Sequence, residues 1–253
     1  MFNRREFVAL AAGAVAAGGP SRQASADNTK SIKFRAIAFD GFPIIDPRPV
    51  FARLEEMFPG KGTELGNVWR ARQFEYTWLR TLGGRYVDFW QVTEEALMFA
   101  AKARGIDLSA SGRDRLMQSW LSLKAWADVG PALQQLKNAG IRMAFLSNLT
   151  EPMLDAAVKN SGLEGYLEPH LSTDRVKAFK PASTAYQMGL DAFKLEKAEI
   201  AFAAFAGWDA AGAKWFGYPT FWVNRLNAPA EELGVAPDGV GSGLSDLVEF
   251  VLG

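Results

Sequence analysis

Five polar side chains stand at or just after the ends of apolar runs that predict buried strands, or just before a predicted helix. They are Asp40, Ser147, Asn148, Lys180 and Asp209. Taken singly, the aspartates and the Ser147-Asn148 pair could cap helices, and Lys180 could be a solvated surface charge. Ligands of open parallel sheets bind beyond the carboxyl ends of the strands, and a carboxylate there can act as a nucleophile. The ordered set of Asp, Ser, Lys and Asp therefore predicts one polar site at that edge of the sheet.

The composition excludes several other kinds of chemistry. The 253 residues include no cysteine, which excludes disulfides, thiolate zinc sites and cysteine nucleophiles. The single histidine, His170, excludes polyhistidine metal sites. The 28 basic and 28 acidic residues balance, which argues against broad nucleic-acid binding. Hydrophobic residues make up 49% of the chain, which is enough for a sizeable core.

The elements that must position these side chains alternate between strands and helices. Apolar runs predict strands at residues 32–39, 141–146, 200–205 and 220–223, and a weaker strand at 166–171. Helical periodicity predicts helices at residues 131–139, 151–161, 182–193, 209–216 and 244–251. This alternation predicts an α/β fold with a doubly wound parallel sheet. Residues 225–243 lack periodicity and are interpreted as a long surface connection.

A helical block interrupts the sheet domain after the first predicted strand. Between residues 47 and 127, apolar side chains such as Phe74, Trp78 and Leu82 recur at helical offsets. No run in that block predicts a strand. We therefore expect a core domain formed by residues 27–46 and 128–253, with residues 47–127 inserted as a helical cap.

Residues 1–26 have the features of an export signal. The pair Arg4-Arg5 precedes a mildly apolar run, and Ala24-Ser25-Ala26 supplies small residues for cleavage. The paired arginines predict twin-arginine export, and therefore a periplasmic location for a mature chain that begins at Asp27. A frayed basic N-terminus, or a membrane anchor if cleavage fails, are the alternatives. No later run is apolar for long enough to predict a membrane span.

Several stretches together carry a family likeness. The most specific ones lie in the predicted cap, at residues 69–70, 73–80, 84–86 and 88–90. Others are Leu146-Ser147-Asn148, Lys180-Pro181 with Tyr186, Trp208-Asp209 with Gly212-Ala213, and residues 216–217 and 222–225. With these stretches, which span nearly all of the mature chain, the sequence resembles the haloacid dehalogenase (HAD) superfamily, and most closely its L-2-haloacid dehalogenases of type II. The resemblance implies a HAD-like Rossmannoid core with a helical cap.

The resemblance also implies an activity, the removal of halide from small 2-haloacids without a metal or another cofactor. Asp40 would be the nucleophile, because a carboxylate can displace halide by in-line attack and form an ester that water then cleaves. Lys180 would keep Asp40 ionised, and Asp209 would orient the hydrolytic water. Ser147 would hold the substrate carboxylate or the nucleophile, and Tyr186 would support the lysine region.

The resemblance assigns the remaining site residues to the halide and to the walls of the pocket. Arg70 would receive the leaving halide by its charge, and Asn148 by its amide donors. Phe74, Phe89 and Trp208 would wall the pocket, and ordinary packing between cap and core is an equal alternative for Phe74.

Some positions depart from the family pattern. The family has Asp-x-Tyr-Gly-Thr at the nucleophile, whereas this chain has Phe42 and Ile44 in place of the Tyr and the Thr. The serine and asparagine that hold the hydrolytic water in the family are replaced by Ala204 and Ala206, and Ala71 replaces a glutamine after the cap arginine. Loss of one positioned polar donor costs about 10²–10³ in rate, so these departures bear on the hydrolysis of the ester.

Two other functions remain as alternatives. A magnesium-dependent phosphatase of the same superfamily needs a second aspartate at the position of Phe42 and an acidic pair of which only Asp209 is present. A non-catalytic binding protein on a dehalogenase scaffold agrees with the departures, but the presence of Asp40 and Lys180 argues against it. The expected partner is a small 2-haloacid, and no nucleic acid or membrane is expected after signal cleavage. The resemblance leaves a homodimer through the cap helices open.

Overall fold

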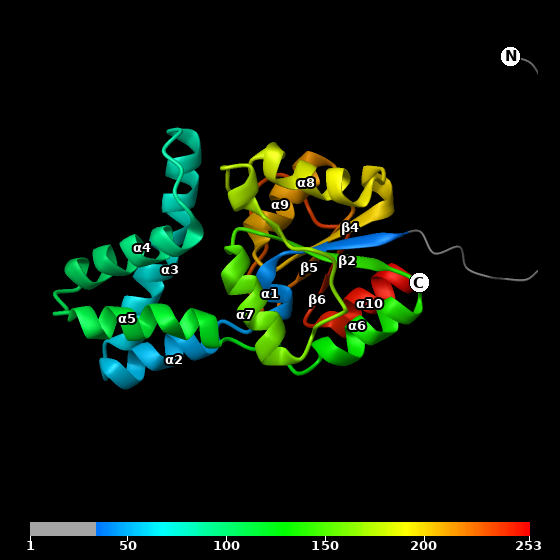
Figure 1. Cartoon of the computed structure of the whole chain (residues 1–253). Coiled ribbons are helices and arrows are strands. Elements are labelled where there is room, and N and C mark those ends of the chain that lie inside the picture. The colour runs from blue at the N-terminus through cyan, green and yellow to red at the C-terminus, as the bar shows by residue number, and fades with distance from the viewer. Residues whose placement is uncertain (1–33) are drawn as a thin grey trace, which may run out of the picture. The chain divides into compact units, whose positions relative to one another are not determined.

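The computed structural model describes residues 34–253, so the export signal expected at residues 1–26 lies outside the described residues. Within residues 34–253, six parallel strands form one sheet in the order β3-β2-β1-β4-β5-β6 (Figure 1). The strands are β1 (Ala36–Phe39), β2 (Arg142–Ser147), β3 (Leu171–Ser172), β4 (Ile200–Ala204), β5 (Thr220–Val223) and β6 (Gly239–Gly241). The order reverses beside β1, which lies between β2 and β4. This arrangement confirms the expected doubly wound parallel sheet.

The two faces of the sheet bury two separate apolar clusters. In β1, Ile37 and Phe39 point into one cluster, and Ala36 and Ala38 point into the other. Every residue of this strand is buried, which explains its continuous apolar sequence. The first cluster is covered by α6 (Val129–Asn138), α7 (Glu151–Ser161) and α10 (Leu244–Leu252), and the second by α8 (Ser183–Phe193) and α9 (Gly207–Phe216) (Figure 1).

Helices fill the segment that was expected to form the cap. They are α2 (Arg48–Met57), α3 (Gly62–Leu82), α4 (Phe89–Ala103), α5 (Ala110–Ser119) and the short 3-10 helix η1 (Trp120–Ser122). The segments that lead into and out of the block lie side by side, because Ile45 and Ala125 form an antiparallel bridge. Within residues 34–253, no helix combines the length and the apolar character that a membrane crossing requires.

Two buried hydrogen bonds fix α3 against α4. The Trp69 indole N–H donates to the carbonyl oxygen of Thr93 at 2.8 Å, and the Gln73 amide donates to the Thr93 hydroxyl at 2.7 Å. Asp88 caps the start of α4 by accepting a hydrogen bond from the Gln91 amide at 2.8 Å. These contacts set the positions of the α3 and α4 side chains that face the core.

Some elements differ from those that the sequence predicts. A one-turn helix, α1 (Gly41–Ile44), follows β1, and two further 3-10 helices are η2 (Thr173–Arg175) and η3 (Lys197–Glu199). The weak strand expected at residues 166–171 is confined to β3, and the surface connection at 225–243 contains β6. The helix expected to begin at residue 182 begins at Ser183 as α8, and Pro181 follows a cis peptide bond in the loop before it.

Candidate active site

Three charged side chains form a continuous, buried row of ion pairs at the carboxyl edge of the sheet. The Lys180 ammonium donates to Asp40 Oδ1 at 2.7 Å and to Asp209 Oδ2 at 2.6 Å. Asp40 directly follows β1, Lys180 lies in the loop before α8, and Asp209 is in the first turn of α9. Lys180 and Asp209 are each 1% exposed and Asp40 is 8% exposed, so Asp40 alone retains some access.

Burial and neighbouring charge act against each other in this row of ion pairs. Burial by itself lowers the pKa of Lys180, but the charges of Asp209 and Asp40 outweigh it and leave the pKa above its ordinary value. Burial raises the pKa of Asp209 to about 6; Lys180 opposes this rise, and the charge of Asp40 adds to it. One ammonium therefore lies between two carboxylates, and the net effect of burial and charge on Asp209 is a raised pKa.

Tyr186 contacts the row of buried charges at Asp209, the end away from Asp40. Its hydroxyl donates to Asp209 Oδ1 at 2.6 Å, so both oxygens of Asp209 are occupied. Tyr186 is fully buried, and its pKa is raised well above the ordinary value by that burial. A Cβ atom at Gly212 would lie 2.6 Å from the Tyr186 hydroxyl, so the close approach of α9 depends on glycine there. The structure thus places Tyr186 behind Asp209.

The end of β2 supplies the neutral polar groups of the site. Asn148 Oδ1 accepts hydrogen bonds from the Lys180 backbone amide at 3.0 Å and from the Thr173 hydroxyl at 3.3 Å. Ser147 Oγ accepts from the Leu149 amide at 3.2 Å. These contacts use acceptor capacity only, so the Ser147 hydroxyl hydrogen and the Asn148 amide hydrogens are the groups left to donate to a ligand.

A small closed cavity lies against Asp40, and we call it the reaction cavity. Its volume is about 10 Å³, close to what one water molecule requires. Its polar lining residues are Asp40, Ser147 and Asn148. The other lining residues are mostly aromatic or aliphatic: Phe42, Phe74, Phe89, Leu149, Phe205, Ala206 and Trp208. Because α3 contributes Phe74 and α4 contributes Phe89, the cavity is closed by the helical block.

Arg70 lies close to the reaction cavity without lining it. Its guanidinium carbon is 5.9 Å from the ring centroid of Phe205, which is one of the cavity walls. The Arg70 side chain is half-buried and forms no ion pair within residues 34–253. Burial lowers its pKa. A partly desolvated guanidinium without a carboxylate partner is a natural site for an anion.

The structure brings most of the expected site residues together. Asp40, Ser147, Asn148, Phe74, Phe89 and Trp208 line the reaction cavity, whereas Lys180, Asp209 and Tyr186 lie behind it. Sequence reasoning missed Leu149 and Phe205 as lining residues and Thr173 as the partner of Asn148. Leu149 and Phe205 each adjoin a recognised position, which was an available signal; Thr173 has no comparable signal. Within residues 34–253, no three His, Asp or Glu side chains gather as metal ligands would.

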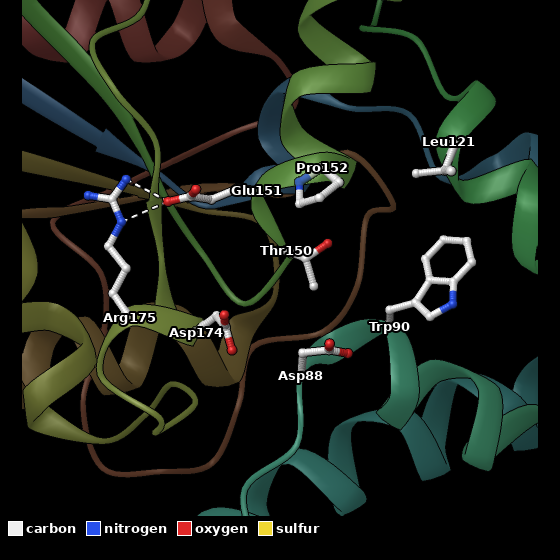
Figure 2. A pocket seen from close by; sticks show the side chains of 8 residues that line it. All are labelled: Asp88, Trp90, Leu121, Thr150, Glu151, Pro152, Asp174 and Arg175. Atoms are coloured by element: carbon white, nitrogen blue, oxygen red, sulfur yellow. Dashed lines mark hydrogen bonds and ion pairs between the residues drawn. The ribbon is translucent and has the colours of Figure 1, made fainter.

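A larger polar cleft, of about 540 Å³, is lined by residues at the start of α4 and at the start of α7. Figure 2 shows its lining residues: Asp88, Trp90, Leu121, Thr150, Glu151, Pro152, Asp174 and Arg175. Arg175 is paired with Glu151 at 2.6 Å (Figure 2), and Asp174 is paired with Lys177 at 2.7 Å. This acidic cleft contains none of the five polar residues that the sequence singled out.

Comparisons with known proteins agree with this geometry. The family model of haloacid dehalogenase-like hydrolases matches residues 9–217. The (S)-2-haloacid dehalogenase of Pseudomonas sp. (strain YL) is 40% identical over 85% of this chain and 94% of its own. A solved L-2-haloacid dehalogenase is 40% identical with a TM-score of 0.85, covering 87% of this chain and 100% of the other. The L-2-haloacid dehalogenase of Xanthobacter autotrophicus, solved with chloropropionic acid covalently bound, is 32% identical with a TM-score of 0.80 over 87% and 99%.

Proposed function

Because the chain belongs to the haloacid dehalogenase-like hydrolases, we propose that it hydrolyses the carbon–halogen bond of (S)-2-haloacids through an ester on Asp40. The observation that carries this proposal is the environment of the Asp40 carboxylate. One oxygen of Asp40 accepts from a buried lysine, and the residue lines a closed cavity with hydroxyl and amide donors opposite apolar walls. A carboxylate held in this way is ionised and poorly hydrated, which are the conditions that favour nucleophilic attack.

The first step is a displacement at C2 of the substrate. Asp40 Oδ1 is engaged by Lys180, so Oδ2 is the oxygen free to attack. The new Oδ2–C2 bond forms as the carbon–halogen bond breaks, and the bonding electron pair leaves with the halide. In-line attack inverts C2, so an (S)-2-haloacid gives an ester with the inverted configuration.

Two groups are placed to receive the anionic parts of the substrate. Arg70 stands beyond the Phe205 wall without an acidic partner, and we assign the departing halide to it together with the Asn148 amide. The Ser147 hydroxyl is the remaining donor in the reaction cavity, and we assign it to the substrate carboxylate.

The second step returns Asp40 to its starting form. Water adds to the Asp40 carbonyl carbon, the bond from that carbon to the ester oxygen breaks, and a 2-hydroxyacid and a proton are released. Asp209 is the carboxylate nearest to this centre through Lys180, so it is the base that we assign to the proton. Ala204 and Ala206 offer no side-chain oxygen to hold the water.

The test is to trap and locate the ester. We expect mass spectrometry of protein quenched during turnover of (S)-2-chloropropionate to show an adduct on Asp40, with chloride and (R)-lactate as products. A single turnover in ¹⁸O-water should place the label first in Asp40. Asp40→Asn should abolish chloride release, while Asp46→Asn, which removes the partner of the exposed Arg48 side chain, should leave it unchanged.

Three results would oppose the proposal. An adduct elsewhere, or chloride release by Asp40→Asn within tenfold of the parent, would exclude Asp40 as the nucleophile. Binding of the haloacid without any adduct or chloride release would favour the non-catalytic binding protein instead.

A further inference from the structure

An apolar groove lies on the far side of Trp208 from the reaction cavity, and we propose that it binds the alkyl chain of long-chain 2-haloalkanoic acids. The inference rests on the proposed function, because it names the substrate class of the same site. Trp208 lines both spaces, and it is the partition between them.

The groove has the size and lining of a small-molecule site. Its volume is about 430 Å³, within the range of pockets that bind organic ligands. Trp78 and Leu82 of α3 form one wall, and Phe179 with Trp215 of α9 and Leu233 form the other parts. None of its lining residues carries a charge, so an occupant must be apolar where it lies in the groove.

Trp208 connects the groove to the reaction cavity through edge-to-face aromatic contacts. Its ring centroid is 5.4 Å from that of Phe74, a wall of the reaction cavity, and 5.5 Å from that of Trp78, a wall of the groove. A rotation of this half-buried side chain would therefore join the two spaces. Without such a change, the reaction cavity of about 10 Å³ cannot hold a haloacid.

The polar cleft on the other side is a poor alternative for the tail. Asp88, Glu151 and Asp174 line it, and the charge of Arg175 is already used by Glu151 (Figure 2). An alkyl chain placed in this cleft would cover charged and polar groups and remove their water, which costs free energy. With the carboxylate and the halogen held near Asp40, we assign the substituent on C2 to the side of Trp208, the residue that lines both the reaction cavity and the groove.

The experiment compares substrates that differ only in chain length. We measure kcat/KM for (S)-2-bromopropionate and (S)-2-bromohexanoate in the wild-type protein, Leu82→Ser and Leu79→Ser. Each buried methylene is worth about fourfold in kcat/KM, so hexanoate should exceed propionate in the wild type. Leu82→Ser should lower the hexanoate-to-propionate ratio about tenfold. Leu79 lies on the same helix and is an exposed leucine like Leu82, but it is absent from the groove, so Leu79→Ser should leave the hexanoate-to-propionate ratio unchanged.

A binding measurement separates this inference from the proposed function. Decanoate, which has no halogen, should quench tryptophan fluorescence and bind Leu82→Ser more weakly than the wild type. That result would support the groove even if no halide were ever released. Equal substrate ratios in all three proteins would overturn the inference. So would sedimentation showing a dimer that Leu82→Ser dissociates while decanoate affinity is unchanged, because a second copy would then cover the groove.

Discussion

Replacing Lys180 by methionine removes the one cation from the row of buried charges while keeping nearly the same length of side chain. Asp40 and Asp209 then face each other across an uncharged group, and Asp209 is 1% exposed. Breaking a buried ion pair by removing one partner costs about 3–5 kcal/mol of unfolding free energy. For a domain of this size, that loss lowers Tm by about 6–20 °C.

The pH dependence of this loss has a definite sign. Without Lys180, the group that lowers the pKa of Asp209 is lost, and burial raises this pKa further above its unfolded value. A group with a raised folded pKa is stabilising below its unfolded pKa, and that contribution is lost as pH rises through the folded pKa. The loss of unfolding free energy in Lys180→Met relative to the wild type should therefore be small near pH 4. It should be largest above the folded pKa of Asp209 in the variant, which exceeds the value of about 6 that Asp209 has beside the lysine.

The assay is urea denaturation of both proteins from pH 4 to pH 9, with halide release measured alongside. Lys177→Met is the matched control, because Lys177 is exposed and pairs with Asp174 at 2.7 Å on the surface; it should lose about 1 kcal/mol or less. Adding Asp209→Asn to Lys180→Met should recover about half of the lost stability and none of the activity. A deficit that is constant with pH, or equal in the two lysine variants, would refute the reasoning.

Two further predictions concern Tyr186 and Arg70. Tyr186→Phe removes a donor that favours ionised Asp209, so the acid limb of the pH–kcat profile, near pH 6 in the wild type, should move up by about one unit. Tyr218→Phe should leave this limb in place, because the Tyr218 hydroxyl donates to the Tyr186 carbonyl oxygen and not to Asp209. Equal midpoints in all three proteins would contradict the coupling. Arg70→Met should lower kcat for halide release by about 10²–10³. It should not lower Tm, because the half-buried Arg70 guanidinium has no ion-pair partner within residues 34–253. A lower Tm with kcat retained would assign Arg70 a structural role instead.

Much of the fold could be predicted because buried parallel strands leave a strong signal. β1, β2, β4 and β5 are nearly continuous apolar runs, since helices cover both faces of the sheet. The edge strands lack that signal. β6 is Gly239-Val240-Gly241 and is only partly buried, and β3 has two residues, so neither produces a periodic pattern.

The site was predictable as a set of residue types at one sheet edge, but its contacts were not. Nothing local links Asp40 to Lys180, 140 positions later, because their contact depends on the loop that carries Lys180 toward the sheet. Tyr186 was expected to support the lysine region, and the structure shows its hydroxyl on Asp209. The reaction cavity also depends on Leu149 and Phe205, which adjoin recognised positions but have no polar group that marks them as part of a site.

The apolar character of the reaction cavity acts in opposite directions on the two steps of the proposed reaction. Aromatic walls strip water from Asp40, and a poorly hydrated carboxylate attacks C2 more readily. The same walls leave the hydrolytic water with few partners, because Ala204 and Ala206 carry no oxygen and both oxygens of Asp209 are already occupied by Lys180 and Tyr186. A proton that adds to Asp209 removes its negative charge and so weakens its pairing with Lys180. The geometry therefore favours formation of the ester over its cleavage, and it makes hydrolysis the step at which Asp209 and its neighbours set the rate.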